Sequence, residues 1–316
     1  MRHKRSAIIQ LAVLAALGVA VLLTLLLPQA ASRRSVQPPL ELSVILREAD
    51  SSVWSNVRLG MEQAAGELRA ELRFLTLSRD NDSQEQEQLL LREAEGGADA
   101  LVVVPADRSL AERREELVGQ LPLVSVESPA GESVVTVAPD NQALGRALGQ
   151  AVAEDWEEGV VLLLQTAPGS EGVSQRLSAA RLLLEEEGVP VETAELAAEE
   201  IGESLLRLLV ETGAQQIVTF EPSATEQAAA AKEEGTLPQL LYGVGLTSRI
   251  AAALERGTVS ASAAWSDFAA GYLAVEGAVS AARGETYQVQ PLPFAVLRGE
   301  DIYEPDNQKR FFPVTT

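Results

Sequence analysis

Residues 97–105 read Gly-Ala-Asp-Ala-Leu-Val-Val-Val-Pro, and this stretch shows the pattern that decides the fold. A glycine closes the preceding segment, a continuous apolar run follows, and a proline ends it. A continuous run, rather than an alternating one, is typical of a strand buried on both faces of a parallel sheet. Residues 213–219, Gly-Ala-Gln-Gln-Ile-Val-Thr, are similar. Two lobes of related topology would explain this likeness, as would chance recurrence of a common turn.

Short apolar runs and amphipathic segments alternate on both sides of this stretch. The pattern predicts strands over residues 42–46, 72–77, 100–104, 123–126, 134–137, 160–164, 189–194, 216–220, 240–244, 258–263 and 293–297. It predicts helices over residues 53–71, 83–95 (capped by Asp82), 142–154, 173–187, 199–212, 223–234, 248–255 and 267–283. The alternation predicts an α/β fold whose parallel sheets are covered by helices on both faces.

Composition excludes several classes of site. The 316 residues contain 25 Lys and Arg against 46 Asp and Glu, which gives a net charge of −21. There is no cysteine and the single histidine is His3, so thiol chemistry, histidine triads and Cys/His metal sites are excluded. The acidic balance argues against nucleic-acid partners. The first strand is followed by no glycine-rich turn, so we expect no dinucleotide cofactor. We also expect no bound metal ion.

The N-terminus determines the predicted compartment. Residues 2–5 are basic, and residues 7–27 are apolar except for a few positions. Twenty-one helical residues span about 30 Å, the thickness of a bilayer's hydrocarbon core. We therefore expect residues 1–34 to comprise a cytoplasmic stub, a single transmembrane helix and the start of a tether, with the remainder outside. The alternative is a signal peptide that is cleaved to release the protein.

Several short motifs carry a resemblance to a known family. They are Asp50-Ser51-Ser52-Val53-Trp54, Asn81-Asp82, Val103-Val104-Pro105-Ala106-Asp107, Leu121-Pro122-Leu123-Val124, Asp140-Asn141 with Gly145, Arg176, and Tyr303-Glu304-Pro305-Asp306-Asn307-Gln308. In this order, over about residues 41–312, the sequence resembles periplasmic sugar-binding proteins of the ribose-binding type (type I periplasmic binding proteins). It is also similar to the ligand-binding half of LacI-type repressors. The apolar segment stands where a repressor would carry its helix-turn-helix, which favours solute binding.

The resemblance implies two doubly wound parallel-sheet lobes joined by a three-strand hinge. The first lobe would comprise residues 40–139 plus 266–292, and the second 140–265 plus 293–316. Ligand would lie between the lobes, beyond the carboxyl ends of the strands. The positions that match the family's ligand-binding residues are Ser51, Trp54, Glu127, Arg176, Glu221 and Trp265.

The matching positions suit a polar ligand with an apolar face. A tryptophan ring can cover the C–H face of a sugar or attract a cation. A carboxylate accepts hydrogen bonds from hydroxyls, and the planar guanidinium of Arg176 can bind two ligand oxygens. The family pattern is broken at Val104, Val244 and Gly245, where polar or aromatic residues are usual, and Ser51 stands for an asparagine. A pentose pocket rich in Asn and Asp is therefore not reproduced.

We therefore expect a membrane-anchored extracytoplasmic protein, not an enzyme, that captures a small sugar-like ligand by lobe closure for ABC-type uptake. Its partner would be an ABC permease and its ectodomain a monomer. The alternatives are a ligand-sensing accessory of a membrane histidine kinase or receptor, a carboxylate glycoside hydrolase, and a degenerate domain that binds no small molecule.

Overall fold

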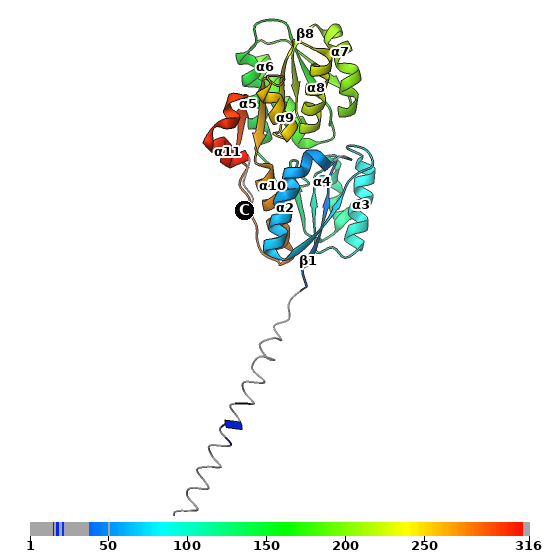
Figure 1. Ribbon diagram of the computed structural model, residues 1–316. Helices are drawn as coiled ribbons and strands as arrows, with labels where there is room; N and C mark the ends of the chain where they lie inside the picture. Colours follow the sequence, from blue (N-terminus) through cyan, green and yellow to red (C-terminus); the bar gives the residue numbers. More distant parts are fainter. Residues whose placement is uncertain (1–14, 16, 19–20, 22–37, 50, 312–316) are drawn as a thin grey trace, which may run out of the picture. The chain divides into compact units, whose positions relative to one another are not determined.

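The computed structural model describes residues 15, 17, 18, 21, 38–49 and 51–311 (Figure 1). By its internal contacts the chain divides into residues 1–39 and one compact unit that begins at Leu40. Two separate β-sheets with flanking helices make up this unit, as the alternating pattern predicted. Each sheet and its helices form one lobe, so the predicted α/β architecture of two lobes is confirmed.

The first lobe contains a five-stranded parallel sheet in the order β2-β1-β3-β4-β5. The strands are β1 (Leu40–Ile45), β2 (Ala70–Leu75), β3 (Ala100–Val103), β4 (Leu123–Val126) and β5 (Val135–Val137). The helical elements are η1 (Ser51–Trp54), α2 (Ser55–Leu68), α3 (Ser83–Glu95), α4 (Ser109–Val118) and α10 (Asp267–Ala282).

Alternate residues of the central strands pack on opposite faces of this sheet. Val102 joins the core under α2 and α10, whereas Leu101 and Val103 join the core under α3 and α4. Both faces are thus dry, which explains why β3 reads as a continuous apolar run.

The second lobe contains a six-stranded sheet in the order β11-β10-β9-β8-β6-β7, in which only the edge strand β11 is antiparallel. Its strands are β6 (Val160–Gln165), β7 (Val191–Glu195), β8 (Ala214–Thr219), β9 (Leu240–Val244), β10 (Ala261–Trp265) and β11 (Phe294–Leu297). Helices α5 (Asn141–Glu154) and α6 (Glu171–Glu186) cover one face. The other face is covered by α7 (Ile201–Thr212), α8 (Pro222–Gly235) and α9 (Ser248–Glu255). The short elements are η2 (Ala198–Glu200), η3 (Glu300–Tyr303) and α11 (Pro305–Phe311).

Glycines allow two helix pairs to pack closely. A Cβ at Gly60 of α2 would lie 2.0 Å from the carbonyl oxygen of Phe268, and one at Gly271 of α10 would lie 1.9 Å from that of Val57. Only glycine leaves room for backbones this close. In the second lobe, Gly145 of α5 meets the backbone of Arg176 in the same way, with 2.2 Å from the built Cβ to the carbonyl oxygen. This contact fixes the position of Arg176 on α6.

The chain passes between the lobes three times, between β5 and α5, between β10 and α10, and between α10 and β11. Two of these passages are joined by a parallel bridge between Pro139 and Leu292, in which the Leu292 N–H donates to Ala138 at 2.9 Å. The strand ends of both sheets therefore meet at the junction of the lobes.

The structure corrects three predictions. Helices α4 and α11 were not expected, because their sequences consist mostly of charged or polar residues. Trp265 is the last residue of β10 and not part of a following loop, because the strand begins three residues later than predicted. Asp82 caps α3 as expected, and its carboxylate accepts from the Glu85 N–H at 3.0 Å.

The predicted transmembrane segment, residues 7–27, falls almost entirely outside the described residues. Among the residues that the structure describes, no helix has the length and apolar character needed to cross a bilayer.

Candidate ligand-binding site between the lobes

Charged side chains from both lobes meet at the junction and are shielded from solvent. Glu127 follows β4 in the first lobe and is 2% exposed, whereas Glu221 follows β8 in the second lobe and is 1% exposed. Arg47, just after β1, and Arg176, on α6, are fully buried. Charges this deeply buried must be paired.

Arg47 binds acceptors in both lobes. Its Nε donates to Glu127 Oε2 at 3.1 Å and its Nη1 to Asn81 Oδ1 at 2.8 Å, both within the first lobe. Its Nη2 donates to Glu221 Oε2 of the second lobe at 2.6 Å and lies 3.1 Å from Glu48 Oε1. One guanidinium therefore joins the ends of three strands from two sheets.

Arg176 forms the reciprocal link from the second lobe. Its Nη2 donates to Glu127 Oε1 at 2.8 Å, across the junction. Its Nε donates to Asn141 Oδ1 at 2.8 Å and its Nη1 to the Phe220 carbonyl at 2.7 Å. Both oxygens of Glu127 are thus occupied by guanidinium groups, one from each lobe.

The environment shifts the pKa values of these carboxyls in opposite directions. Burial by itself would raise the pKa of Glu127, but the charges and hydrogen bonds of Arg47 and Arg176 outweigh it and lower that pKa. Burial dominates for Glu48 and raises its pKa to about 8, although Arg47 opposes the shift. Burial, followed by the negative charge of Glu127, raises the pKa of Asp267 to about 7. Four carboxyls thus share the junction with two guanidiniums, and the pKa values of two of the four, Glu48 and Asp267, are raised.

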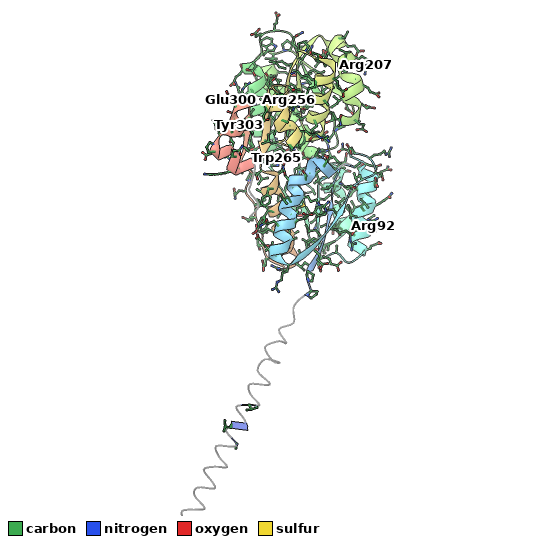
Figure 2. The ribbon with its side chains drawn as sticks, in the orientation of Figure 1. Arg92, Arg207, Arg256, Trp265, Glu300 and Tyr303 are labelled. Atoms are coloured by element: carbon green, nitrogen blue, oxygen red, sulfur yellow. The ribbon has the colours of Figure 1, made fainter. Side chains whose placement is uncertain are left out.

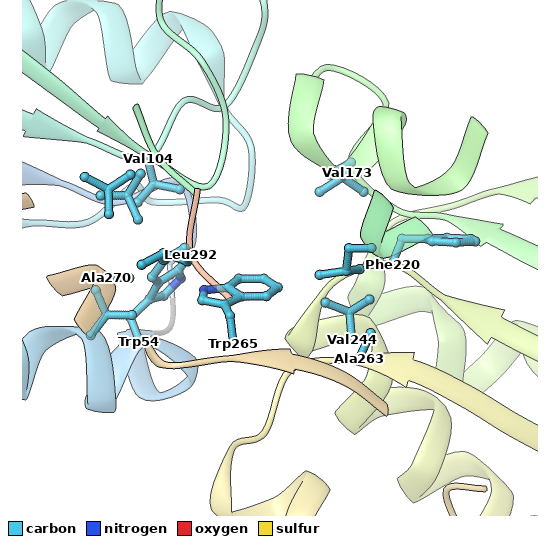
Figure 3. Packing of buried hydrophobic residues seen from close by; sticks show 14 of the residues in the cluster. Trp54, Val104, Val173, Phe220, Val244, Ala263, Trp265, Ala270 and Leu292 are labelled. Atoms are coloured by element: carbon cyan, nitrogen blue, oxygen red, sulfur yellow. The ribbon is translucent and has the colours of Figure 1, made fainter. Parts of the chain in front are cut away.

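Two tryptophans line the same junction. The Trp54 Nε1–H donates to Glu48 Oε2, and the Trp265 ring centroid lies 5.1 Å from Arg176 Cζ, within cation–π range. Figure 3 shows the Trp265 ring between Trp54 and the second-lobe residue Phe220, all within one hydrophobic cluster. In Figure 2, Trp265 lies where the lobes meet, whereas Arg207 lies on an outer surface.

Small groups complete the contact between the lobes. Ser128 Oγ of the first lobe lies 2.9 Å from Ser170 Oγ and accepts from the Gly172 N–H, also at 2.9 Å. A Cβ at Gly172 would lie 2.5 Å from the carbonyl oxygen of Glu127. The lobes therefore meet so closely here that the second residue of α6 must lack a side chain.

A cavity of about 340 Å³ lies at the rim of the junction, with lining residues from both lobes. It is lined by Glu48, Ala49, Ser52, Val53, Ser78, Arg79, Asp80, Ala198, Glu199, Ser223, Glu226, Gln227 and Arg249. Its volume falls within the range that small ligands occupy. Glu48 connects this rim cavity to the buried charges.

The structure brings together five of the six predicted positions, Trp54, Glu127, Arg176, Glu221 and Trp265. Ser51 lies in η1, three residues before Trp54. The departures Val104 and Val244 are buried among core residues, so they offer no polar group to a ligand.

Sequence reasoning missed four polar residues at the junction, Arg47, Glu48, Asn81 and Asp267, as members of the site. Arg47 and Glu48 stand immediately after the first strand, so the rule that ligands bind beyond strand carboxyl ends already pointed to them. Asp267 begins α10, directly after the second passage, which leads back to the first lobe. Within the described part of the chain, no group of three or more His, Asp or Glu side chains is arranged to hold a metal ion.

Comparisons with known structures extend over nearly the whole fold. A carbohydrate transporter solute-binding protein from Agrobacterium radiobacter in complex with D-arabinose is similar, with a TM-score of 0.78 and 16% identity over 86% of this chain and 98% of that one. An Agrobacterium vitis solute-binding protein bound to α-D-tagatopyranose is similar with a TM-score of 0.77 and 16% identity. The match covers 87% of this chain and 100% of that one. The periplasmic component of an ABC-type sugar transport system from Hahella chejuensis is similar with a TM-score of 0.73 and 24% identity. The match covers 82% of this chain and 99% of that one. No curated protein matches the chain.

The sequence itself identifies the family. Residues 42–286 match the profile of the periplasmic binding protein domain, which confirms the resemblance to ribose-binding-type proteins. The match covers more than three quarters of the chain, which belongs to the periplasmic binding protein domain family and, as predicted, is a binding protein and not an enzyme.

Proposed function

We propose that this protein binds a small sugar-like solute between its two lobes and delivers it to an ABC permease. The observation that carries the proposal is the convergence of Glu127, Arg176 and Glu221 on one buried cluster from two separate sheets. Arabinose, fucose and tagatose are the ligands of three similar structures, all under 25% identical. Family membership implies an extracytoplasmic domain.

The chemistry of the junction fits a polyhydroxylated ligand. The carboxylates of Glu127 and Glu221 would accept hydrogen bonds from hydroxyls, and the guanidinium of Arg176 would donate to ring or hydroxyl oxygens. Trp54 and Trp265 would cover the apolar face of the ring. Since these polar groups now bind one another, a solute must exchange ligand hydrogen bonds for the internal ones.

We propose the three passages between the lobes as the hinge. Opening about residues 138–140, 266 and 283–293 would expose the cluster, and closure would remove the solute from water. The rim cavity changes shape in this motion because both lobes line it, so a permease can distinguish the two states there.

For the N-terminus we propose a retained membrane anchor formed by residues 7–27, because this apolar stretch follows a basic cluster. The alternative role, a ligand-sensing accessory of a membrane kinase, uses the same closure. Co-purification of the full chain with a permease supports uptake, and co-purification with a kinase supports sensing.

Thermal unfolding of the full chain in detergent, against a panel of pentoses, hexoses, polyols and amino sugars, tests solute binding. A ligand at about 100 times its Kd adds about 2.7 kcal/mol to the free energy of unfolding. The matched variant Glu221→Gln should lose this shift, whereas Glu233→Gln, in an exposed ion pair with Arg256, should retain it. A panel without any stabilising solute contradicts the proposal.

A further inference from the structure

We propose that Arg47 is a tethered occupant of the ligand site, which holds the lobes closed when no solute is bound. This inference rests on the proposed function, since it assigns a regulatory role to the same site. It begins from the position of Arg47, which is fully buried and surrounded by acceptors from both lobes.

Arg47 takes up the hydrogen-bonding capacity that a solute would need. The Glu127 carboxylate binds Arg47 through Oε2 and Arg176 through Oε1. The Glu221 carboxylate binds Arg47 through Oε2 and accepts from the Thr166 hydroxyl through Oε1. Both expected acid contacts are therefore engaged from within the chain, and a ligand has to compete with guanidinium groups for these acceptors.

Arg47 is the guanidinium that can be displaced. Arg176 is held by the Asn141 side chain and the Phe220 carbonyl, both in its own lobe. Arg47 binds Glu127 and the half-buried Asn81 in its own lobe, and its remaining charged partner, Glu221, lies across the junction. The next residue, Glu48, lines the rim cavity together with Asp80. A displaced Arg47 side chain thus has both space and acidic partners to receive it.

Two ion pairs cross the junction, and each lobe supplies the arginine of one pair and the glutamate of the other. Arg47 of the first lobe binds Glu221 of the second, and Arg176 of the second lobe binds Glu127 of the first. Because both pairs are shielded from water, opening the lobes separates charges that attract each other strongly. Both pairs therefore oppose separation of the lobes when no solute is bound.

The distance between the lobes of the ligand-free protein tests the proposal. The sequence contains no cysteine, so Glu95→Cys on α3 and Glu203→Cys on α7, both exposed, place one spin label on each lobe. Double electron–electron resonance on the full chain in detergent should give one short distance without solute. Adding Arg47→Ala should lengthen it, whereas the control Arg58→Ala, which breaks an exposed pair within α2, should not. A ligand-free protein with the same long distance as Arg47→Ala overturns the proposal.

A second variant and a chemical probe show whether a longer distance in Arg47→Ala reflects open lobes or a misfolded protein. Glu221→Gln keeps Arg47 but removes its charged partner in the second lobe, so it should also lengthen the distance; an unchanged distance contradicts the proposal. Methylguanidinium should restore the short distance in Arg47→Ala, and neutral methylurea should not. Equal effects of the two, or none, overturn the role of Arg47 as an occupant.

This experiment separates the two proposals. If the ligand-free protein is closed and opens on Arg47→Ala, but no sugar changes its thermal stability, solute binding fails while the role of Arg47 stands. If sugars stabilise a protein whose ligand-free lobes are already open, solute binding stands and the role of Arg47 fails.

Discussion

The inner and outer parts of the junction use the same residue types with different consequences. The inner pairs, Arg47–Glu221 and Arg176–Glu127, are buried and cross between the lobes. Around the rim cavity, Arg79–Asp82 and Arg249–Glu226 each lie within one lobe, and their arginine side chains are 82% and 74% exposed. Solvent screens the outer pairs, whereas loss of one inner partner leaves a buried charge unpaired. The location of a pair, not its presence, decides whether it holds the lobes together.

The largest effect is expected when the shared inner acceptor loses its charge. Glu127→Gln keeps the shape of the side chain but leaves Arg47 and Arg176 without their common carboxylate. We expect the free energy of unfolding to fall by about 3 kcal/mol, measured by urea denaturation. The control Glu211→Gln, in an exposed pair with Arg207, should change it by less than about 0.5 kcal/mol. A loss of similar size in both variants would erase the distinction between inner and outer pairs.

Steric separation of the lobes should be the next largest effect. In Gly172→Ala the new Cβ would lie 2.5 Å from the Glu127 carbonyl oxygen and 2.8 Å from Ser128 Oγ, so closure is strained. We expect urea denaturation to show a loss of about 1–3 kcal/mol. Gly202→Ala on α7 has no neighbour within 4 Å and should be neutral or stabilising by up to about 1 kcal/mol. Equal stability of the two variants would mean that the lobes do not meet at Gly172.

The raised pKa values of Glu48 and Asp267 predict a stability that declines as pH rises from 7 to 8. The folded-state pKa of Glu48 is about 8, above its unfolded value, so the folded protein retains a proton that the unfolded chain releases. The stabilising contribution is complete below the unfolded pKa and is lost as pH rises through the folded one. Asp267, at about 7, acts in the same direction at lower pH. Between pH 7 and 8 we expect a decline of about 1 kcal/mol from Glu48.

Urea denaturation at several pH values tests this expectation. Glu48→Gln should flatten the curve between pH 7 and 8, since the amide does not titrate. The rim variant Glu199→Gln should follow the wild-type curve, because Glu199 is exposed. A wild-type curve that rises between pH 7 and 8 would show that Glu48 is ionised in the folded protein.

The smallest effect is expected at the rim. Arg249→Ala removes an exposed partner of Glu226 and should lower the free energy of unfolding by less than about 1 kcal/mol, with a still smaller effect at high salt. The distance between spin labels on the two lobes should stay at its wild-type value. If Arg249→Ala lowered the free energy of unfolding by more than about 2 kcal/mol, the outer pairs would also contribute to holding the lobes together.

Much of the fold was predictable because its central strands are apolar on both faces. The bounds of β9 and α9 agree with the pattern to the residue. Helix α4 was missed because only Leu110, Leu117 and Val118 of its ten residues are buried, so it shows little apolar periodicity. Trp265 was placed after its strand because alanine and serine dominate β10 and give a weak strand signal.

The site was less predictable than the fold. The resemblance selected Glu127, Arg176 and Glu221, and the structure brings them together, yet their binding roles stay a prediction. Nothing in the local sequence shows that Arg47 binds Glu221, because the two residues are 174 positions apart and meet only where the lobes meet. Pairing across a junction depends on tertiary structure, which no short motif records.

The contact of α2 with α10 also bears on how the molecule is made. Gly60 and Gly271 join a helix near the start of the domain to one near its end. A ribosome releases the first helix more than two hundred residues before the second, so the first lobe stays incomplete until most of the polypeptide has been synthesised. The lobe can be completed only after its last helix has been synthesised.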